Sequence, residues 1–155
     1  LLNRQVASCF STAFHQVAYV NWELRAHRAR ANGVVSGEAM SKMWAEEIGK
    51  CWGPAVAMQE RDHWRWMTIP HFVFARFYCY SYAFGKLLTL SLHRLWKERG
   101  DAFVNDYVGL LTAGGSRTPM DLFAEMDLDL SDPSFWQGGL DVVRGYMDEL
   151  ERLAP

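Results

Sequence analysis

Residues 69–95 read IPHFVFARFYCYSYAFGKLLTLSLHRL, and this stretch carries the strongest helical pattern in the chain. Pro70 favours a helix that starts directly after it, because its ring presets a helical φ and keeps Ile69 extended. Apolar side chains then recur every three or four residues, the spacing of one helix face. The predicted core face consists of Phe74, Phe77, Ser81, Phe84, Leu88, Leu92 and Leu95. We therefore expect one long helix from about His71 to Arg99-Gly100.

Two earlier helices are predicted by the same reasoning. The first has its expected apolar face at Val6, Phe10, Ala13, Val17, Val20 and Leu24. It should end near Asn32-Gly33. Ser36 is a suitable cap for the second helix, whose apolar side consists of Met40, Met43, Trp44 and Ile48. Gly53-Pro54 should end it.

Three further helices are expected in the last third of the chain. One runs from about Asp101 to Thr112 and stops at Gly114-Gly115. Thr118-Pro119 and Asp132-Pro133 each combine a capping side chain with proline at the first helical position, and the last helix should reach Leu153. Because no alternating strand pattern extends beyond a few residues, the predicted fold class is all-α.

Length and composition limit the domain organisation and the classes of partner that we expect. The 155 residues are half apolar, which predicts a single helical segment, 1–155, with one substantial core. The net charge of −2 is spread along the chain, so neither nucleic acid nor a membrane is an expected partner. Cys9, Cys51 and Cys79 form no C-x-x-C pair, which is typical of a soluble protein in a reducing cytoplasm.

No complete metal site is visible in the sequence. The zinc motif H-E-x-x-H is absent, and the nearest substitutes are the pairs Glu23 with His27 and Glu60 with His63. Each pair supplies only two ligands, and both are better explained as surface pairs on helices. A small metal-binding helical bundle built on Glu60 and His63 remains an alternative.

One histidine and three tyrosines are concentrated at the head of the long predicted helix. At about 100° per residue, Tyr78 and Tyr82 lie within roughly 20° of the direction of His71, whereas Tyr80 points to the opposite side. One face could therefore present an imidazole and two phenols. The alternative is that the tyrosines fill the core, with their hydroxyls on backbone partners and His71 as a cap.

Several motifs in this sequence resemble those of the oligoendopeptidase F family, which belongs to the larger group that contains thimet oligopeptidase. That family carries an I-P-H-F run before a run of alternating tyrosines, as in Ile69-Pro70-His71-Phe72 and Tyr78-Cys79-Tyr80-Ser81-Tyr82 here. Further matches are Phe14-His15-Gln16, where the family has F-R-Q, the pair Trp22-Glu23, the loop LTAGGS at 111–116, and Asp132-Pro133 after 126–130. The resemblance covers nearly the whole chain.

This resemblance implies a cytoplasmic zinc metalloendopeptidase that hydrolyses short oligopeptides and has the shape of a mostly helical clamshell. In that family the H-E-x-x-H helix and a later glutamate ligand lie upstream of the region that matches Leu1. Zinc is thus the implied cofactor of the full-length enzyme, and none is expected on this segment, which should be inactive alone. The implied partners are short peptides and the missing N-terminal zinc-binding half.

The resemblance also implies roles for the residues at the head of the helix. His71 and one or more of Tyr78, Tyr80 and Tyr82 would hydrogen-bond the substrate carbonyl and the oxyanion that develops on it. His71 and Tyr78 would in addition bind substrate. The chain starts without Met inside a helical pattern, which indicates a fragment, and the resemblance implies that it is the C-terminal part of the peptidase. A non-catalytic helical interaction module, a degenerate half of a peptidase, is the alternative function.

Overall fold

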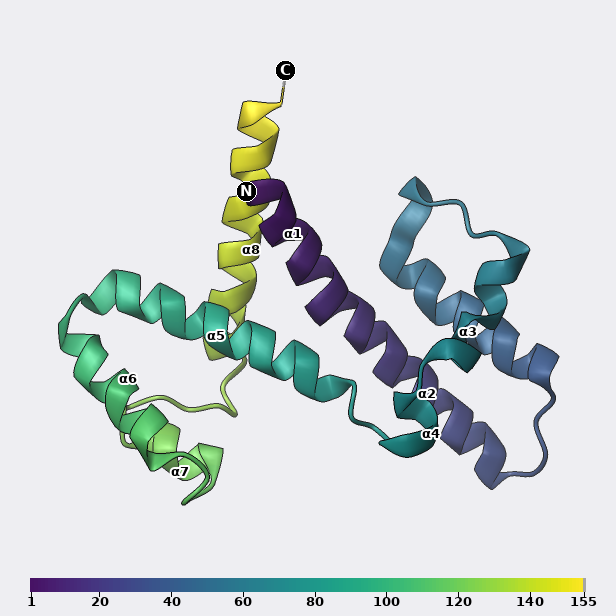
Figure 1. Cartoon of the computed structure of the whole chain (residues 1–155), viewed down its shortest axis with the longest axis horizontal. Coiled ribbons are helices and arrows are strands. Elements are labelled where there is room, and N and C mark those ends of the chain that lie inside the picture. Colours follow the sequence, from purple (N-terminus) through teal and green to yellow (C-terminus); the bar gives the residue numbers. More distant parts are fainter. Residues whose placement is uncertain (155) are drawn as a thin grey trace. The chain divides into compact units, whose positions relative to one another are not determined.

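The computed structural model describes residues 1–154, and all regular structure in this range is helical (Figure 1). The α-helices are α1 (Leu2–Cys9), α2 (His15–Ala31), α3 (Gly37–Trp52), α4 (His71–Phe74), α5 (Tyr80–Arg99), α6 (Ala102–Ala113), α7 (Pro119–Ala124) and α8 (Pro133–Leu153). Three other segments are the π-helix η1 (Phe10–Phe14) and the 3₁₀-helices η2 (Gly53–Ala55) and η3 (Glu60–Thr68). The all-α prediction is confirmed. Within the described range, no helix combines the length and apolar character that crossing a membrane requires.

The chain divides into two compact units, and the boundary falls inside α1 and inside α5. One unit comprises Leu1–Val6 and the chain from Gly85 onward, and the other comprises Ala7–Phe84. The core of the first unit is formed by Leu92, Phe103, Leu122, Phe123, Met126, Leu128 and Leu130. The core of the second is formed by Ala18, Trp22, Ala26, Trp44 and Ile48. That residues 1–155 fold as one domain stays a prediction.

The predicted helix starts are confirmed by side-chain caps. The capping hydrogen bonds run from Ala39 N–H to Ser36 Oγ at 3.2 Å, from Asp121 N–H to Thr118 Oγ1 at 3.3 Å, and from Ser134 N–H to Asp132 Oδ1 at 2.8 Å. Two predicted stops are confirmed as well, because α3 and α6 each end at a glycine with positive φ, 62° at Gly53 and 51° at Gly114.

The predicted core face of the first helix is wrong at Phe10, Val17 and Leu24, which are exposed, whereas Ala13 is buried as predicted. The π-helix η1 adds one residue to a turn, so the buried positions continue from Ala13 by a step of five to Ala18 and then by steps of four to Trp22 and Ala26. Val17, which the pattern assigned to the core, is 47% exposed, while its neighbour Ala18 is 5% exposed. A continuous α-helical count could not anticipate this shift.

The predicted long helix from His71 is also wrong, because the chain leaves the helix between Phe74 and Tyr80. Ala75 has φ −144° and ψ 69°, and Phe77 has a positive φ of 58°, which side chains other than glycine rarely adopt. Phe74, the first residue of the predicted core face, is 85% exposed. The end of the helix is as predicted, since α5 reaches Arg99 and Leu92 is buried.

Aromatic packing in the second unit fixes the position of α4. The Phe72 ring lies 4.5 Å from the Trp22 ring and 6.2 Å from the Trp44 ring, measured between centroids. The two indoles are themselves anchored by hydrogen bonds, from Trp22 Nε1 to the Met40 carbonyl at 3.1 Å and from Trp44 Nε1 to the Asp62 carbonyl at 2.9 Å. Because these indole rings are rigid and their N–H groups are hydrogen-bonded, they fix the position of α4 on the core.

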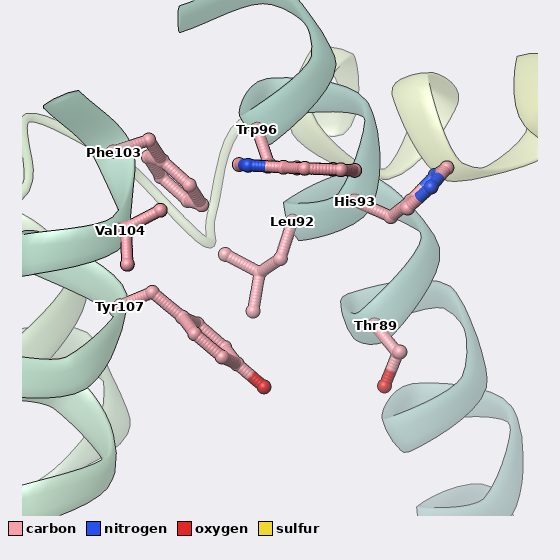
Figure 2. A pocket seen from close by; sticks show the side chains of 7 residues that line it. All are labelled: Thr89, Leu92, His93, Trp96, Phe103, Val104 and Tyr107. Carbon is pink, nitrogen blue, oxygen red and sulfur yellow. The ribbon is translucent and has the colours of Figure 1, made fainter. Parts of the chain in front are cut away.

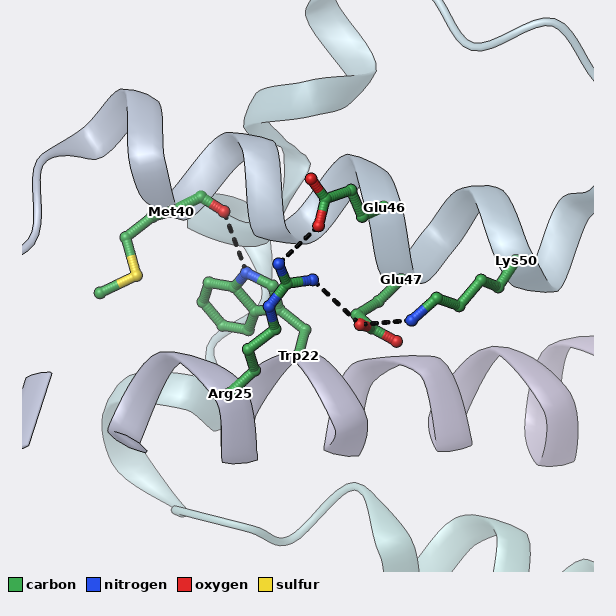
Figure 3. A network of polar contacts seen from close by, with 6 residues as sticks. All are labelled: Trp22, Arg25, Met40, Glu46, Glu47 and Lys50. Carbon is green, nitrogen blue, oxygen red and sulfur yellow. Dashed lines mark hydrogen bonds and ion pairs between the residues drawn. The ribbon is translucent and has the colours of Figure 1, made fainter. Parts of the chain in front are cut away.

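Charged side chains on one side of this core join α2 to α3 (Figure 3). Arg25 of α2 contacts Glu46 at 2.5 Å and Glu47 at 3.1 Å, and Lys50 contacts Glu47 at 2.8 Å. Arg25, Glu46 and Lys50 remain in contact with solvent, so screening reduces the strength of these pairs. Their main effect is therefore to determine which faces of α2 and α3 meet, and their contribution to the stability of the unit is small.

The one-residue shift in the core face can be tested with two neighbouring substitutions. Ala18→Glu should lower the free energy of unfolding by about 2 kcal/mol or more, because it buries a charge without a partner. Val17→Glu should change it by less than about 1 kcal/mol, because that side chain reaches water. Urea unfolding monitored by tryptophan fluorescence measures both. A larger loss of unfolding free energy for Val17→Glu than for Ala18→Glu would show instead that the core face is that of an uninterrupted helix.

Candidate active site

His71 opens α4, directly after Pro70. Ile69 is extended, with φ −94° and ψ 102°, and Pro70 takes the N-cap position with φ −64°. The adjacent Phe72 packs into the tryptophan core, so the first turn of α4 is held while His71 remains partly accessible to solvent. Pro70 and Phe72 thus present the imidazole at a fixed position on the surface of the second unit.

Three of the predicted site residues, His71, Tyr78 and Tyr82, form one cluster. The Tyr82 hydroxyl lies 3.0 Å from His71 Nε2, a hydrogen bond. The Tyr78 ring stacks on the imidazole with a centroid distance of 5.6 Å and an interplanar angle of 3°. The Tyr82 ring stands edge-on to both of its partners. We call this the His-Tyr cluster.

The cluster exists because the long helix is broken. In an uninterrupted α-helix, residues seven and eleven positions apart are separated along the axis by about 10 Å and 16 Å. The observed ring distance between Tyr78 and His71 and the hydrogen-bond distance between His71 and Tyr82 are both far shorter. The sequence pattern indicated a common direction, and the turn between α4 and α5 brings the side chains into contact.

Tyr80, the fourth predicted site residue, lies apart from the cluster. It is the first residue of α5, its side chain is 60% exposed, and among residues 1–154 it forms no aromatic ring contact and no hydrogen bond through its hydroxyl. The expectation that it points away from His71 therefore agrees with its placement. Whether it takes part in substrate binding stays a prediction.

The turn that creates the cluster is held by Glu23 of α2, whose side chain is 1% exposed. Its Oε1 accepts the Phe77 N–H at 2.8 Å, and the Phe77 ring lies 4.8 Å from the His27 ring one helical turn further on. Glu23 and His27 therefore both hold Phe77, and the expectation that they form a surface pair is wrong for Glu23, which is buried. Helical counting missed this role because Trp22 and Ala26 are brought into the core beside Glu23 only by the π-helical shift.

Cys79 is excluded as a nucleophile although it lies between two tyrosines of the motif. Its side chain is buried, and burial, with a further contribution from the negative charge of Glu23, raises the pKa of the thiol to about 11. The thiol therefore stays protonated near neutral pH, and the protonated form is not the reactive one. This leaves hydrogen-bond donors and acceptors as the chemistry of the site.

The residues that the structure describes show no metal site. Glu60 is exposed and His63 is partly buried, and both belong to η3. Among residues 1–154, no group of three or more histidine, cysteine, aspartate or glutamate side chains is arranged to hold a metal ion. The described residues thus offer no set of three or more protein ligands such as a zinc site requires.

Two apolar cavities of similar size lie in different units. One, of about 370 Å³, is in the second unit and is lined by Glu23, His27 and aromatic side chains that include Trp66 and Phe72. The other, of about 350 Å³, lies between α5 and α6 in the first unit (Figure 2) and is lined by Thr89, Leu92, His93, Trp96, Phe103, Val104 and Tyr107. None of the predicted site residues lines either cavity.

Comparison with known proteins identifies the family. Residues 1–142 match peptidase family M3. This chain belongs to that family. Over 154 residues it is 27% identical to a plasmid-encoded oligoendopeptidase F of Lactococcus lactis subsp. cremoris, covering 99% of this chain and 26% of that protein. It is 24% identical to oligopeptidase PepF of Bacillus subtilis strain 168, covering 99% of this chain and 23% of that protein.

The fold of this chain is similar to that of a solved structure. The crystal structure of oligoendopeptidase-F from Enterococcus faecium superposes with a TM-score of 0.88 at 24% identity, covering 98% of this chain and 29% of that one. The M3 chain described here therefore spans about a quarter of the length of the relatives it matches.

His15 stands where the sequence motif of the family usually has arginine. The His15 imidazole accepts a hydrogen bond from Trp52 Nε1. Burial, and to a smaller extent the nearby positive charge of Arg65, lowers the pKa of His15 below its usual value. In this M3 chain the position is therefore neutral near neutral pH and cannot replace the charge of an arginine.

Thiol alkylation tests the environment of Cys79. In the native protein at mildly alkaline pH, iodoacetamide should modify Cys79 at least roughly 10-fold more slowly than in urea, because the buried thiol is protonated and shielded. Cys51 is less buried and serves as the internal comparison. Mass spectrometry of the digested protein measures both rates, and rapid native labelling of Cys79 would show that the turn is open to solvent.

Proposed function

We propose that this chain is part of the catalytic domain of a zinc metalloendopeptidase that hydrolyses peptide bonds in short oligopeptides in the cytoplasm. Membership of peptidase family M3 and similarity to proteins named oligoendopeptidase F support the reaction class. The observation that carries the proposal is the His-Tyr cluster, in which an imidazole and two phenols meet at the surface. We propose that the cluster binds the carbonyl group of the peptide bond that is hydrolysed.

The cluster offers what the hydrolysis of a peptide bond requires on the carbonyl side. When water adds to the carbonyl carbon, the carbonyl oxygen gains negative charge. Fixed O–H and N–H donors near that oxygen stabilise the charge more than they stabilise the neutral carbonyl, which lowers the barrier. Phenol hydroxyls and an imidazole N–H are such donors. His71, Tyr78 and Tyr82 are therefore proposed as catalytic residues, with Tyr80 as a weaker candidate.

The contacts within the cluster suggest a division of roles. The Tyr82 hydroxyl is engaged with His71 Nε2 and fixes the orientation of the imidazole. The Tyr78 hydroxyl has no hydrogen bond within residues 1–154, and its side chain is 48% exposed. Tyr78 is therefore free to donate to a ligand. We propose that Tyr78 and His71 bind the substrate carbonyl and that Tyr82 orients His71.

Zinc, in this proposal, is held by another part of a longer protein. This chain spans about a quarter of its relatives, and its described residues present no set of three metal ligands. The partner implied for the cluster is therefore a zinc-binding half of the same chain, together with a short peptide substrate. The residues described here supply hydrogen bonds to the reacting carbonyl and do not supply the metal.

Two substitutions in the full-length protein test the catalytic assignment. Tyr78→Phe and His71→Ala should each lower kcat by roughly 10²-fold or more, the size of effect expected when an oxyanion donor is lost. KM should change less, because the interaction is strongest in the transition state. Steady-state cleavage of a fluorogenic peptide measures both constants.

Tyr80→Phe compares the weaker candidate with the cluster. It removes the same hydroxyl group from a tyrosine outside the cluster, and kcat should fall by less than roughly 10-fold. If Tyr78→Phe and His71→Ala leave kcat unchanged, the cluster has no catalytic role. A non-catalytic interaction module would then be the better description.

Metal content tests the assignment of zinc to another part of the protein. The purified 155-residue chain should contain no stoichiometric zinc, whereas the full-length peptidase should contain zinc that a chelator removes together with activity. Elemental analysis after dialysis measures the ratio of metal to protein. Tight stoichiometric zinc on the 155-residue chain alone would place the metal site within it.

A further inference from the structure

The buried Glu23 side chain makes one specific polar contact, which gives it a role beyond packing. It is almost fully buried, and one of its oxygens, Oε2, has no hydrogen-bond partner among residues 1–154. Burying a carboxylate is unfavourable, so such a group requires a specific interaction to offset the loss of water. The interaction present is the hydrogen bond from Phe77 N–H to Oε1 at 2.8 Å.

This hydrogen bond stabilises a backbone conformation that the local sequence disfavours. Phe77 has φ 58°, where the Cβ of an L-residue is crowded. In a continuous helix the Phe77 N–H would bond to the Val73 carbonyl instead. Glu23 offers it a side-chain oxygen as acceptor, and His27 adds a ring contact to the Phe77 side chain from the next turn of α2. Tertiary contacts from one helix thus hold the turn.

The geometry of the His-Tyr cluster depends on that turn. Tyr78 follows Phe77 directly, and its ring lies parallel to the His71 ring at 5.6 Å. Without the turn, a straight helix would place Tyr78 about 10 Å along the axis from His71, and the two rings could not stack. The hydrogen bond between Tyr82 and His71 would be lost for the same reason.

We infer that Glu23 is a positioning residue for the His-Tyr cluster: its carboxylate fixes the Phe77 turn, and the turn brings Tyr78 and Tyr82 to His71. This inference rests on the proposed function for its effect on catalysis, whereas the hold on the turn stands independently of it. Glu23 does not contact substrate in this assignment and acts only through the cluster.

The direct test is amide hydrogen exchange at Phe77 in the full-length protein. Glu23→Leu removes the acceptor while keeping an apolar side chain of similar size, and exchange of the Phe77 amide should accelerate by roughly 10-fold or more. Glu23→Gln keeps an acceptor oxygen and should retain most of the protection. Unchanged exchange in Glu23→Leu would overturn the inference whatever the enzyme's activity.

Activity measurements show whether the turn acts through the cluster. Glu23→Leu should lower kcat by roughly 10-fold or more with little change in KM, and Glu23→Gln should restore kcat to within about threefold of the unsubstituted enzyme. Glu47→Leu is the matched control, since Glu47 is also a buried acid of the same unit but pairs with Arg25 and Lys50 (Figure 3). Its kcat should stay unchanged.

A background without the cluster separates positioning from a direct role. In a His71→Ala, Tyr78→Phe enzyme, adding Glu23→Leu should lower kcat no further, because residues that act as a unit are not additive. A further multiplicative loss would overturn the inference. If His71→Ala and Tyr78→Phe have no effect on kcat, the proposed function fails, while the exchange experiment still decides the role of Glu23.

A second variant covers the case in which Glu23→Leu does not fold. Phe77→Gly removes the steric cost of the positive φ, so it should make the turn less dependent on Glu23 and partly restore kcat when combined with Glu23→Leu. Glu23→Gln alone is also informative: a folded Gln variant that protects the Phe77 amide but loses kcat 10-fold or more would show that the charge acts directly on the reaction, against the inference.

Discussion

The hydrogen bond between the Glu23 carboxylate and the Phe77 amide is the interaction on which the candidate site depends. It joins α2 to a residue more than fifty positions later in the chain and holds that residue at a positive φ. A charged acceptor in a poorly hydrated environment binds an amide more strongly than a neutral one does. The helix therefore ends at Phe74 and restarts at Tyr80, in spite of the local preference for continuing it.

Two other features place Glu23 where it can act. The π-helical segment shifts the register of the first helix by one residue, which turns Trp22 and Ala26 inward beside Glu23. Trp22 then packs against Phe72, which seats α4 on the same core. α2 therefore holds the chain on both sides of the break, at Phe72 and at Phe77. A change in the helix register would affect both contacts together.

Membership of peptidase family M3 gives these contacts a chemical context. In the proposed function, this chain supplies donors to the reacting carbonyl while another part of a longer protein holds the metal. Such a division requires the donors to be fixed by their own unit, because a small displacement of a hydrogen-bond donor costs much of its effect on the transition state. The buried carboxylate and the tryptophan core provide that fixation inside the unit that contains the cluster.

The sequence by itself determined the all-α class, most helix boundaries and the resemblance to a peptidase family. These follow from local physics, since caps such as Ser36 and stops such as Gly53 act within a few residues. It also predicted that His71, Tyr78 and Tyr82 belong to one site, because the three side chains share a direction on a helix. Only the tertiary structure decided that Ala18 replaces Val17 in the core, that the helix breaks before Tyr80, and that Glu23 holds the break. Helical counting assumes an unbroken geometry, and a contact between Glu23 and Phe77, distant in sequence, can overrule it.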